Sequence, residues 1–499
     1  MTALDLAKLQ NGSDIRGIAI ATEEYEANLT VEAMEKIASG LIHWLRQKSE
    51  SPLTVGVGQD SRLSGQSLKE ALINALVTQG VKVIDFGLAT TPAMFMSTQF
   101  TEFACDAGVM LTASHLPYYF NGVKIFSQNG GAEKEDIAYI LSHTQVISSE
   151  AGEVVQGDIL TPYAEDMVKK IRQGITGNPE KPLTGLKIVV DAGNGAGGFF
   201  ADKVLVPLGA DTTGSQFLEP DGNFPNHIPN PDNQEAMESI QQAVLNHQAD
   251  LGVIFDTDVD RSAVVTKTGD VLNRNNLIAV LSRIVLAEHP GTSIVTNSPT
   301  TDHLKEFIEA LKGKQVRYIS GYRNVINKAI ALNQAGIDCQ LAIETSGHAA
   351  FKENYFLDDG AYVIAKILML LPQLQSEGQT LEGLIADLKQ PVETQEVRFK
   401  LEEADYRKLG ETVIADLAEI EVAGWQVDPE NDEGIRFKLS APFGSGWFLV
   451  RMSLHEPLLV LQVENDQAGN NLKVLRELQK FIDKYSTVNQ EKLIAVLGA

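Results

Sequence analysis

The sequence contains very little cysteine and no long apolar run, and both absences narrow what the protein can be. Only Cys105 and Cys339 occur among 499 residues, which excludes a disulfide framework and a multi-cysteine metal site and fits a reducing compartment. The longest apolar runs, such as YVIAKILMLL at 362–371, contain lysine and are too short to span a bilayer. The opening segment, MTALDLAKLQNGSD, lacks the apolar core of a signal peptide. We therefore expect a cytoplasmic protein with no membrane partner.

Basic residues are also scarce relative to acidic ones. There are 41 Lys and Arg residues against 66 Asp and Glu residues, a formal net charge of −25. Because such a field repels phosphate backbones, we expect no nucleic-acid partner. A small anionic ligand remains compatible with this charge where one cleft is locally basic. The apolar content of 43% is ordinary for a globular protein with a large core, and the length predicts about three or four domains.

One local pattern occurs three times along the chain. A short apolar strand is followed by a Gly/Asp/Ser loop and then by an amphipathic helix in residues 54–80, 187–209 and 293–313. Strands that alternate with helices indicate α/β layers. We therefore predict three similar α/β domains with mixed sheets.

The last hundred residues follow a different pattern. Strand-like segments at 397–401, 435–440, 446–453 and 458–465 are separated mostly by short turns, and helix-like stretches cover 405–420 and 471–486. Strands grouped in this way are typical of an antiparallel sheet. We therefore predict a C-terminal α+β domain. The predicted domain limits are 1–160, 161–275, 276–390 and 391–499.

A first candidate site follows the apolar strand GVMLT at 108–112. This strand delivers Ser114 and His115 into a loop that leads to Lys124. A serine hydroxyl is a poor nucleophile unless a base or a cation assists it, and both are close in the sequence here. Neighbouring serine and histidine residues are common, so a polar turn between two strands stays open as the alternative.

A second candidate site is the acidic segment LGVIFDTDVDRSAVV at 251–265. Asp256, Asp258 and Asp260 follow a buried strand at alternate positions, which project to one side of an extended chain. Carboxylates that converge repel one another unless a cation neutralises them, and hard oxygen ligands suit Mg²⁺. An EF-hand is disfavoured because Arg261 and Lys267 stand where that loop needs Gly and Glu. The segment nearly matches the DxDx(T/V) motif of a class of phosphatases, but Asp260 stands where that motif has Thr or Val.

A third loop, LAIETSGHAAF at 341–351, alternates Glu344, Ser346 and His348 after another apolar strand. Carboxylate and hydroxyl groups could bind neighbouring sugar hydroxyls, and the imidazole could bind a phosphate. The segment SGYRNVI at 320–326 adds Arg323 in a glycine turn. Taken alone, this loop is only a weak indication of a binding site, and a loop without a binding role is the favoured alternative.

A fourth loop lies between two strands in FLVRMSLHEPLLVL at 448–461. Arg451, Ser453 and His455 alternate there. Arginine offers a planar fork of donors that fits phosphate, and the hydroxyl and imidazole groups could complete a phosphate cradle. A β-hairpin with incidental polar residues is the alternative.

A glycine-rich pattern follows the strand KIVVD. Gly193, Gly195 and Gly198 match G-x-G-x-x-G, and Asp211 and Glu219 follow. This motif can indicate a dinucleotide-binding site, but a single match is weak evidence for one. We interpret these glycines as turn and packing residues of the strand-loop-helix pattern.

Together the four loops resemble those of the α-D-phosphohexomutases. TASHLP, DTDVDR, ETSGH and RMSLHEP occur in the order of that family's T-A-S-H-N-P, D-G-D-G-D-R, G-E-x-S-G-H and R-x-S-G-T-E-P loops. NGSDIRG at 11–17 is similar to the family's N-terminal arginine motif, and GQDSRLSG at 58–65 and DGNFPNHIPNP at 221–231 are also similar to family segments. The resemblance covers nearly the whole chain. It implies three α/β domains and a C-terminal α+β domain arranged around a central cleft.

The resemblance also implies an activity. The protein would be an intramolecular phosphotransferase that interconverts hexose 1-phosphates and 6-phosphates through a phosphoserine and a bisphosphorylated sugar. It would use Mg²⁺ and a hexose 1,6-bisphosphate activator, act on small hexose phosphates, and be a monomer or a homodimer. Phosphoglucomutase/phosphomannomutase activity is favoured. Phosphoglucosamine mutase activity and a catalytically silent sugar-phosphate-binding protein are the alternatives.

Site residues follow from the same resemblance. Ser114 would be the phosphoserine and would join Asp256, Asp258 and Asp260 around Mg²⁺. Arg16, His115 and Lys124 would bind the transferring phosphoryl group or act in acid and base steps, with Lys124 preferred for the proton. The residues that would bind substrate are Arg261, Arg323, Glu344, Ser346, His348, Arg451, Ser453 and His455.

The chain departs from the family pattern at several positions. Leu116 replaces an Asn after Ser-His, and Leu454 and His455 replace Gly-Thr in the phosphate loop. We expect these changes to affect efficiency and the choice of sugar. Thr257 and Val259 replace the small residues of the metal loop. Because their side chains can face away from the metal, we expect metal binding to survive.

Overall fold

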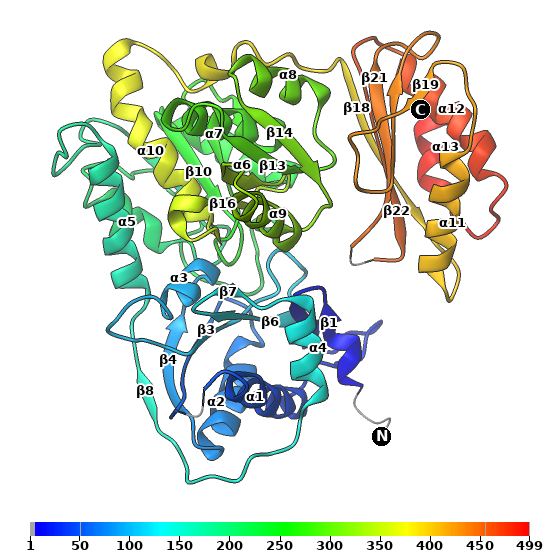
Figure 1. The fold of residues 1–499 in the computed structure, drawn as a ribbon. Helices are drawn as coiled ribbons and strands as arrows, with labels where there is room; N and C mark the ends of the chain where they lie inside the picture. Colours follow the sequence, from blue (N-terminus) through cyan, green and yellow to red (C-terminus); the bar gives the residue numbers. More distant parts are fainter. Residues whose placement is uncertain (1–4, 50, 455, 499) are drawn as a thin grey trace. The chain divides into compact units, whose positions relative to one another are not determined.

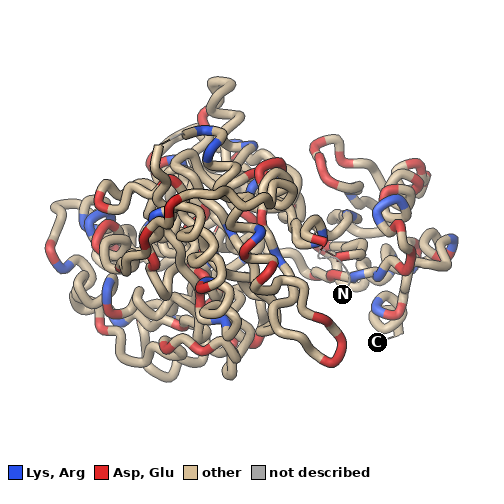
Figure 2. The backbone as a smooth tube through the Cα atoms, turned by 90° about the horizontal axis from the view of Figure 1, so that it is seen from below, with Lys and Arg blue, Asp and Glu red and all other residues tan. Residues whose placement is uncertain are grey.

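A computed structural model describes residues 5–49, 51–454 and 456–498 (Figure 1). They form two compact units. The first comprises the described residues up to Leu277 together with Ser346–Leu384, and the second comprises Ile278–Thr345 and the described residues from Ile385 onward. Acidic residues are distributed along the described chain (Figure 2). Among the described residues, no helix combines the length and apolar character needed to cross a membrane.

The first unit begins with an eight-stranded mixed sheet in the order β1-β2-β6-β5-β3-β4-β8, with β7 beside β6. Its strands are β1 (Gln10–Asn11), β2 (Asp14–Ile18), β3 (Thr54–Gln59), β4 (Lys82–Leu88), β5 (Ala107–Leu111), β6 (Phe120–Ser127), β7 (Gly130–Gly131) and β8 (Val154–Gln156). The helical segments are η1 (Leu6–Leu9), α1 (Val31–Arg46), α2 (Gly65–Thr78), α3 (Thr91–Met96) and α4 (Lys134–Ser142). Strands β3 and β5 are parallel neighbours, so the loops that follow them emerge at the same edge of the sheet.

A second sheet in this unit has the order β12-β11-β10-β9. Its strands are β9 (Ile188–Asp191), β10 (Leu251–Phe255), β11 (Ser262–Thr266) and β12 (Val271–Leu272), and β9 and β10 are parallel. The unit also contains α5 (Leu160–Gly174), α6 (Gln234–His247), β16 (Ala349–Phe351), η3 (Lys352–Asn354), β17 (Leu357–Asp358) and α10 (Gly360–Glu377). Helix α10 packs against α5 and β11, which brings the chain after Ser346 back to this sheet.

The helix expected in residues 187–209 differs from the prediction. In place of a long amphipathic helix, β9 leads through the glycine loop into a six-residue π-helix, Phe200–Leu205. The glycines lie too close to their neighbours for side chains: a Cβ on Gly195 would be 2.6 Å from the Thr257 carbonyl oxygen, and one on Gly198 would be 2.3 Å from that of Leu218. Close packing therefore explains the glycine pattern, and it holds the chain out of a regular helix at its start.

The second unit contains a parallel group of strands and an antiparallel sheet. The parallel group runs β14-β13-β15, formed by β13 (Ser293–Asn297), β14 (Lys314–Tyr318) and β15 (Cys339–Ile343), with α8 (Asp302–Ala310) and α9 (Tyr322–Gln334). Helix α7 (Arg274–Glu288) and the 3-10 turn η4 (Glu382–Ile385) connect segments of the chain.

The C-terminal sheet confirms the predicted antiparallel arrangement. Its order is β18-β22-β21-β20-β19, formed by β18 (Glu393–Lys400), β19 (Trp425–Val427), β20 (Ile435–Leu439), β21 (Gly446–Met452) and β22 (Leu458–Asn465). Helices α11 (Tyr406–Ala418), α12 (Asn470–Ile482) and α13 (Glu491–Gly498) accompany it. The short strand β19 and the helix α13 were absent from the prediction.

Buried charges join the C-terminal sheet to the loop after β13 within this unit. The Arg436 side chain is fully buried and donates to the carbonyl oxygens of Ser298 and Thr300, at 3.1 Å each, and to Asp302 at 2.9 Å. Its guanidinium carbon lies 3.7 Å from the centre of the Trp447 ring. A buried charge is stable only when its donors are satisfied, so this contact fixes the two parts of the unit together.

Candidate active site

Ser114 lies at the edge of the first sheet, three residues beyond the end of β5, and is 2% exposed. Its φ of +52° is unusual for a residue with a side chain. The Ser114 hydroxyl donates to Asp256 Oδ2 at 3.0 Å and accepts from Arg261 Nη2 at 2.6 Å. The serine loop and the acidic loop, 142 positions apart between Ser114 and Asp256, therefore meet at one hydroxyl group.

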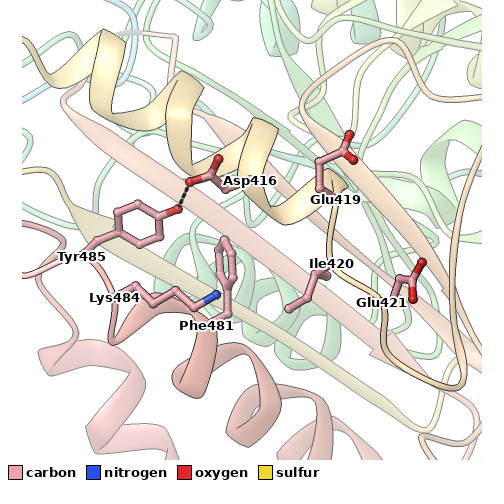
Figure 3. A pocket seen from close by; sticks show the side chains of 7 residues that line it. All are labelled: Asp416, Glu419, Ile420, Glu421, Phe481, Lys484 and Tyr485. Atoms are coloured by element: carbon pink, nitrogen blue, oxygen red, sulfur yellow. Dashed lines mark hydrogen bonds between the residues drawn. The ribbon is translucent and has the colours of Figure 1, made fainter.

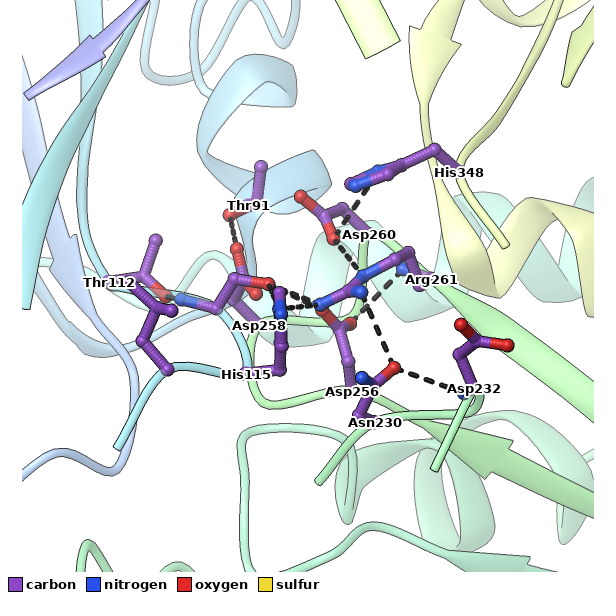
Figure 4. A network of polar contacts seen from close by, with 12 residues as sticks. Thr91, Thr112, His115, Asn230, Asp232, Asp256, Asp258, Asp260, Arg261 and His348 are labelled. Carbon is purple, nitrogen blue, oxygen red and sulfur yellow. Dashed lines mark hydrogen bonds and ion pairs between the residues drawn. The ribbon is translucent and has the colours of Figure 1, made fainter. Parts of the chain in front are cut away.

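Three aspartates converge directly after β10, as the sequence predicts. Asp256, Asp258 and Asp260 are fully buried, and one oxygen from each lies within 4.8 Å of the others (Figure 4). The cause differs from the expected extended chain, because the segment is a tight turn in which Val259 has a φ of +66°. The turn, and not strand alternation, directs the carboxylates to one place.

Cationic side chains surround these carboxylates. Lys124 lies inside strand β6 and not in a loop, and its Nζ donates to Asp260 and lies 3.5 Å from Asp258. Arg261 Nε donates to Asp256 at 3.0 Å. His348 Nδ1 lies 2.6 Å from Asp358 and 3.7 Å from Asp260. These contacts offset the repulsion that the aspartates would otherwise exert on one another.

The pKa values of the site separate into two groups. Burial, reinforced by the charge of Asp260, raises the pKa of Asp256 well above its ordinary value. Burial also opposes ionisation of Asp260, but the charges of Lys124, His348 and Arg261 hold its pKa below the ordinary value.

The pKa values of the two histidines of the site also shift in opposite directions. For His348, burial favours the neutral form, but Asp358 and Asp260 raise the pKa to about 9. For His115, the charge of Arg261 and then burial lower the pKa to about 2. His348 is therefore charged and His115 is neutral at neutral pH.

Arg16 and His115 complete the surroundings of Ser114. Arg16 lies in β2, where it donates to Asp14 at 3.2 Å and to the Ala113 carbonyl oxygen at 3.5 Å. His115 Nδ1 lies 2.7 Å from Arg261 Nη2 and 3.5 Å from the Ser114 hydroxyl. Because the neutral ring can accept the Arg261 proton at Nδ1, this nitrogen is occupied and is poorly placed to act as a base.

The remaining predicted residues lie elsewhere along the chain. In the second unit, Glu344 accepts from the Gly321 backbone N–H at 2.7 Å, and Arg323 at the start of α9 donates to Asn327 at 3.2 Å. Arg451 lies next to the last residue of β21, with its Nη1 3.9 Å from Glu433. Ser453 follows β21, Ser346 opens the returning segment of the first unit, and His455 lies outside the described residues. The predicted residues that the first unit brings together are Arg16, Ser114, His115, Lys124, Asp256, Asp258, Asp260, Arg261 and His348.

Several residues that support the site escaped the sequence prediction. Thr91 donates its hydroxyl to Asp258, and its backbone N–H donates to the Asp258 carbonyl oxygen at 2.9 Å. Asn230 accepts from Arg261 at 3.4 Å, and Arg62 donates to the backbone of the serine loop. Arg62 and Asn230 lie inside the noted segments GQDSRLSG and DGNFPNHIPNP, which was the available signal. Nothing in the sequence pattern singled out Thr91.

A surface hollow in the C-terminal domain is separate from these residues. It is lined by Asp416, Glu419, Ile420, Glu421, Phe481, Lys484 and Tyr485 (Figure 3). Most of these belong to α11, to α12 or to the turns that follow them, and none was predicted as a site residue. The candidate active site is therefore the Ser114 and aspartate cluster.

This cluster has the ligand chemistry of a divalent metal site. Three buried carboxylates supply hard oxygen atoms, and Asp258 Oδ1 and Asp260 Oδ1 are buried without a hydrogen-bond partner. A buried carboxylate oxygen without a partner is costly unless a cation binds it. The residues therefore fit a divalent cation.

Comparison with known proteins supports one family throughout. Residues 7–150, 161–269 and 273–392 match the α/β/α domains I, II and III of phosphoglucomutase/phosphomannomutase. A phosphomannomutase/phosphoglucomutase of Pseudomonas putida is 33% identical over 87% of this chain and 86% of its own length. A phosphoglucomutase of Neisseria gonorrhoeae is 31% identical over 91% of this chain and 92% of its own.

Solved structures lead to the same family. A phosphoglucomutase/phosphomannomutase family protein of Burkholderia thailandensis superimposes with a TM-score of 0.78 at 26% identity, covering 96% of this chain and 98% of that one. The predicted fold class is thereby confirmed as three α/β/α domains followed by a domain with an antiparallel sheet. Family matches over three domains and relatives along nearly the full length agree with the predicted activity. The chain belongs to the phosphoglucomutase/phosphomannomutase family and is a phosphohexomutase, an isomerase that moves a phosphoryl group between positions of a hexose.

Proposed function

We propose that this phosphohexomutase works through a phosphoserine at Ser114 and interconverts the 1-phosphates and 6-phosphates of glucose and mannose. The observation that carries the proposal is the Ser114 hydroxyl, which contacts Asp256 at 3.0 Å and Arg261 at 2.6 Å. A carboxyl group and a guanidinium on one buried hydroxyl supply a hydrogen-bond acceptor that orients it and a donor for phosphate oxygens.

The proposed reaction has two transfers. In the first, the bond from Ser114 Oγ to phosphorus breaks as a bond forms between phosphorus and a free hydroxyl of the hexose phosphate. The proton that leaves the sugar hydroxyl ends on Ser114 Oγ. In the second, the other phosphoryl group of the bisphosphorylated sugar passes to Ser114, and the proton moves the opposite way. A hexose 1,6-bisphosphate therefore also loads the free enzyme, which accounts for the proposed activator.

Charge compensation is the main demand of phosphoryl transfer. Arg261 and Arg16 are proposed to hold the oxygens of the transferring group, since both guanidinium groups contact the serine loop. Lys124 is the proposed acid and base, because its ammonium lies among the same carboxylates. His115 is instead a proposed orienting group, since its accepting nitrogen faces Arg261.

Asp256, Asp258 and Asp260 are proposed to hold Mg²⁺ together with the phosphorylated Ser114. When bound, Mg²⁺ would neutralise charge on the transferring phosphoryl oxygens. The protein's part is to keep the carboxylates converged: Thr91 fixes Asp258, and the backbone N–H of Arg261 donates to Asp256 at 3.1 Å.

Residues of the second unit, together with Ser346 of the first, are proposed to bind the rest of the substrate. Glu344 would accept sugar hydroxyls, and Ser346 would add a hydroxyl. Arg451 and Ser453 would hold the phosphate that does not react, with Arg323 as a further cation. The predicted domain limits remain part of this proposal.

Phosphopeptide mass spectrometry and a coupled assay test the proposal together. The purified protein, incubated with glucose 1,6-bisphosphate, should carry phosphate on Ser114. With Mg²⁺ and a trace of the bisphosphate, glucose 1-phosphate and mannose 1-phosphate should be converted to 6-phosphates. Ser114→Ala should abolish both signals, whereas Ser61→Ala, a serine in the neighbouring loop, should retain them.

The other outcomes are distinct. Phosphate on Asp256 with release of inorganic phosphate would replace the mutase mechanism by a phosphatase. A preference for glucosamine 1-phosphate would keep the mechanism and change the substrate. Failure to convert any of the three sugars, with the protein folded, would contradict the proposed activity.

A further inference from the structure

Arg62 lies in the loop between β3 and α2, and its guanidinium group is fully buried. It donates to four carbonyl oxygens of the serine loop. Nη2 donates to Ser114 at 2.5 Å and to Leu116 at 2.6 Å, and Nη1 donates to Pro117 at 2.8 Å and to Phe120 at 3.1 Å. A single planar fork of donors therefore spans the segment from Ser114 to Phe120.

The opposite side of Ser114 is held by the ion-pair partner of Arg62. Asp60 Oδ2 lies 3.4 Å from Arg62 Nε and accepts the Thr112 hydroxyl at 2.6 Å. The same Thr112 hydroxyl accepts from the Ser114 backbone N–H at 3.0 Å. The Asp60–Arg62 pair thus controls both backbone polar groups of Ser114, one directly and one through Thr112.

Ser114 needs such a restraint because its backbone is in the left-handed region, with φ at +52°. A residue with a side chain keeps this conformation only when its surroundings determine it. In the ordinary regions of φ, the same Cα would direct the side chain elsewhere, and the contacts of its hydroxyl with Asp256 and Arg261 would be lost.

We infer that Arg62, paired with Asp60, is the positioning residue that holds Ser114 in the conformation needed for phosphoryl transfer. The inference rests on the proposed function of Ser114. Arg62 acts through the backbone of the loop and touches none of the reacting atoms. The loop is therefore shaped before substrate arrives, and Arg62 should affect the transfer step more than substrate binding.

Arg62→Lys is the first test. An ammonium group keeps the charge but cannot span four carbonyl oxygens in a fixed plane. We expect kcat to fall about 100-fold, the effect of a misplacement on the order of 1 Å, with KM changed less than threefold. Phosphate loading of Ser114 from glucose 1,6-bisphosphate should slow by a similar factor. Arg172→Lys is the matched control, because Arg172 donates to the carbonyl oxygens of Glu180 and Pro207, away from the serine loop.

Chemical rescue distinguishes a positioning role from a merely structural one, because the two roles predict different responses of kcat to added guanidinium. Arg62→Ala should regain at least tenfold in kcat when guanidinium ion is added at concentrations far below denaturing ones. Ammonium chloride at the same ionic strength should give no gain. The wild-type protein and Arg172→Ala should not be activated by guanidinium.

Thr112 supplies a test that does not depend on the folding of an Arg62 variant. Thr112→Val keeps the side-chain shape but removes the hydroxyl between Ser114 and Asp60, and we expect kcat to fall about tenfold. Thr112→Ser should stay within threefold of the wild type. The inference is overturned if folded Arg62→Lys keeps kcat within threefold of wild type, if guanidinium fails to rescue folded Arg62→Ala, or if Thr112→Val equals Thr112→Ser. Should no Arg62 variant fold, the Thr112 pair decides. A wild-type protein without phosphate on Ser114 would instead refute the proposed function.

Discussion

Val259 places a β-branched residue in the left-handed region of the backbone, between two of the converging aspartates. Its φ is +66° and its side chain is fully buried. For a residue with a Cβ this conformation costs roughly 1–2 kcal/mol, whereas glycine adopts it freely. We predict that Val259→Gly is at least as stable as Val259→Ala, the reverse of the usual order.

The magnitude follows from a comparison with a buried valine of ordinary backbone. Val253, in β10, is also fully buried. At either position, Val→Ala removes two buried carbon groups, worth about 1.6 kcal/mol at roughly 0.8 kcal/mol each. Replacing Ala by Gly at Val253 should cost roughly a further 0.5–1 kcal/mol. At Val259, release of the strain offsets that loss, so the two pairs should differ by about 1–2 kcal/mol.

Differential scanning calorimetry of the four variants, with and without Mg²⁺, measures this difference. Because the first unit, which contains Val259, is longer than 250 residues, 1 kcal/mol shifts Tm by roughly 1–2 °C. We expect Val259→Gly to melt at or above Val259→Ala, and Val253→Gly to melt below Val253→Ala. If the glycine variants lie below the alanine variants by the same margin at both positions, the turn at Val259 stores no strain and the reasoning fails.

Three further predictions concern charge. Mg²⁺ at about 100 times its Kd should stabilise the wild type by about 2.7 kcal/mol, which is measured as a higher Tm. Asp258→Asn should abolish this rise in Tm, whereas Asp202→Asn, an exposed control, should keep it. His227 contacts Asp191 at 3.0 Å. Burial lowers the pKa of His227, but the effect of Asp191 is larger and raises the pKa above its ordinary 6.5. The stabilisation is therefore complete below pH 6.5 and is lost as pH rises through the raised pKa, so His227→Gln should lower Tm more at pH 6 than at pH 9; equal losses at both pH values would contradict this. Arg436→Met should destabilise the second unit by about 3 kcal/mol in urea unfolding, because the carbonyl oxygens of Ser298 and Thr300 lose their donor and Arg317 is, among the described residues, the one arginine still in contact with Asp302 and Asp428. The exposed Arg398→Met should cost less than about 0.5 kcal/mol, and similar losses for the two would refute the assignment.

Local pattern predicted much of the fold. The strand–loop–helix segments at 54–80 and 293–313 formed as expected, because apolar periodicity reports which face of each element is buried. The helix expected after β9 did not form in full. Its reason is tertiary: Gly195 and Gly198 pack against the backbone of Thr257 and Leu218, which are distant in the sequence. No local pattern contains that constraint.

The local sequence pattern also identified the reactive groups of the site, but not the residues that hold them in position. The three aspartates and Ser114 stood out by residue type and position after strands. Arg62 was indicated only by the segment GQDSRLSG that contains it, and Thr91, at the start of α3, by nothing, because a single arginine or threonine has no distinctive local signature. Their roles depend on four carbonyl oxygens at 114–120 and on a carboxylate at 258, which only the folded chain brings within reach.

The sequence by itself determined the composition of the site and the class of chemistry, because residue types fix the available ligands, nucleophile and charges. Tertiary structure alone decided how those groups are held. The Ser114 hydroxyl meets Asp256 only because the loop after β5 and the turn after β10 come together, and two residues of the site with left-handed φ, Ser114 and Val259, are fixed by partners far along the chain. Strained backbone conformations are stabilised by distant contacts, and distant contacts are what a local pattern cannot encode.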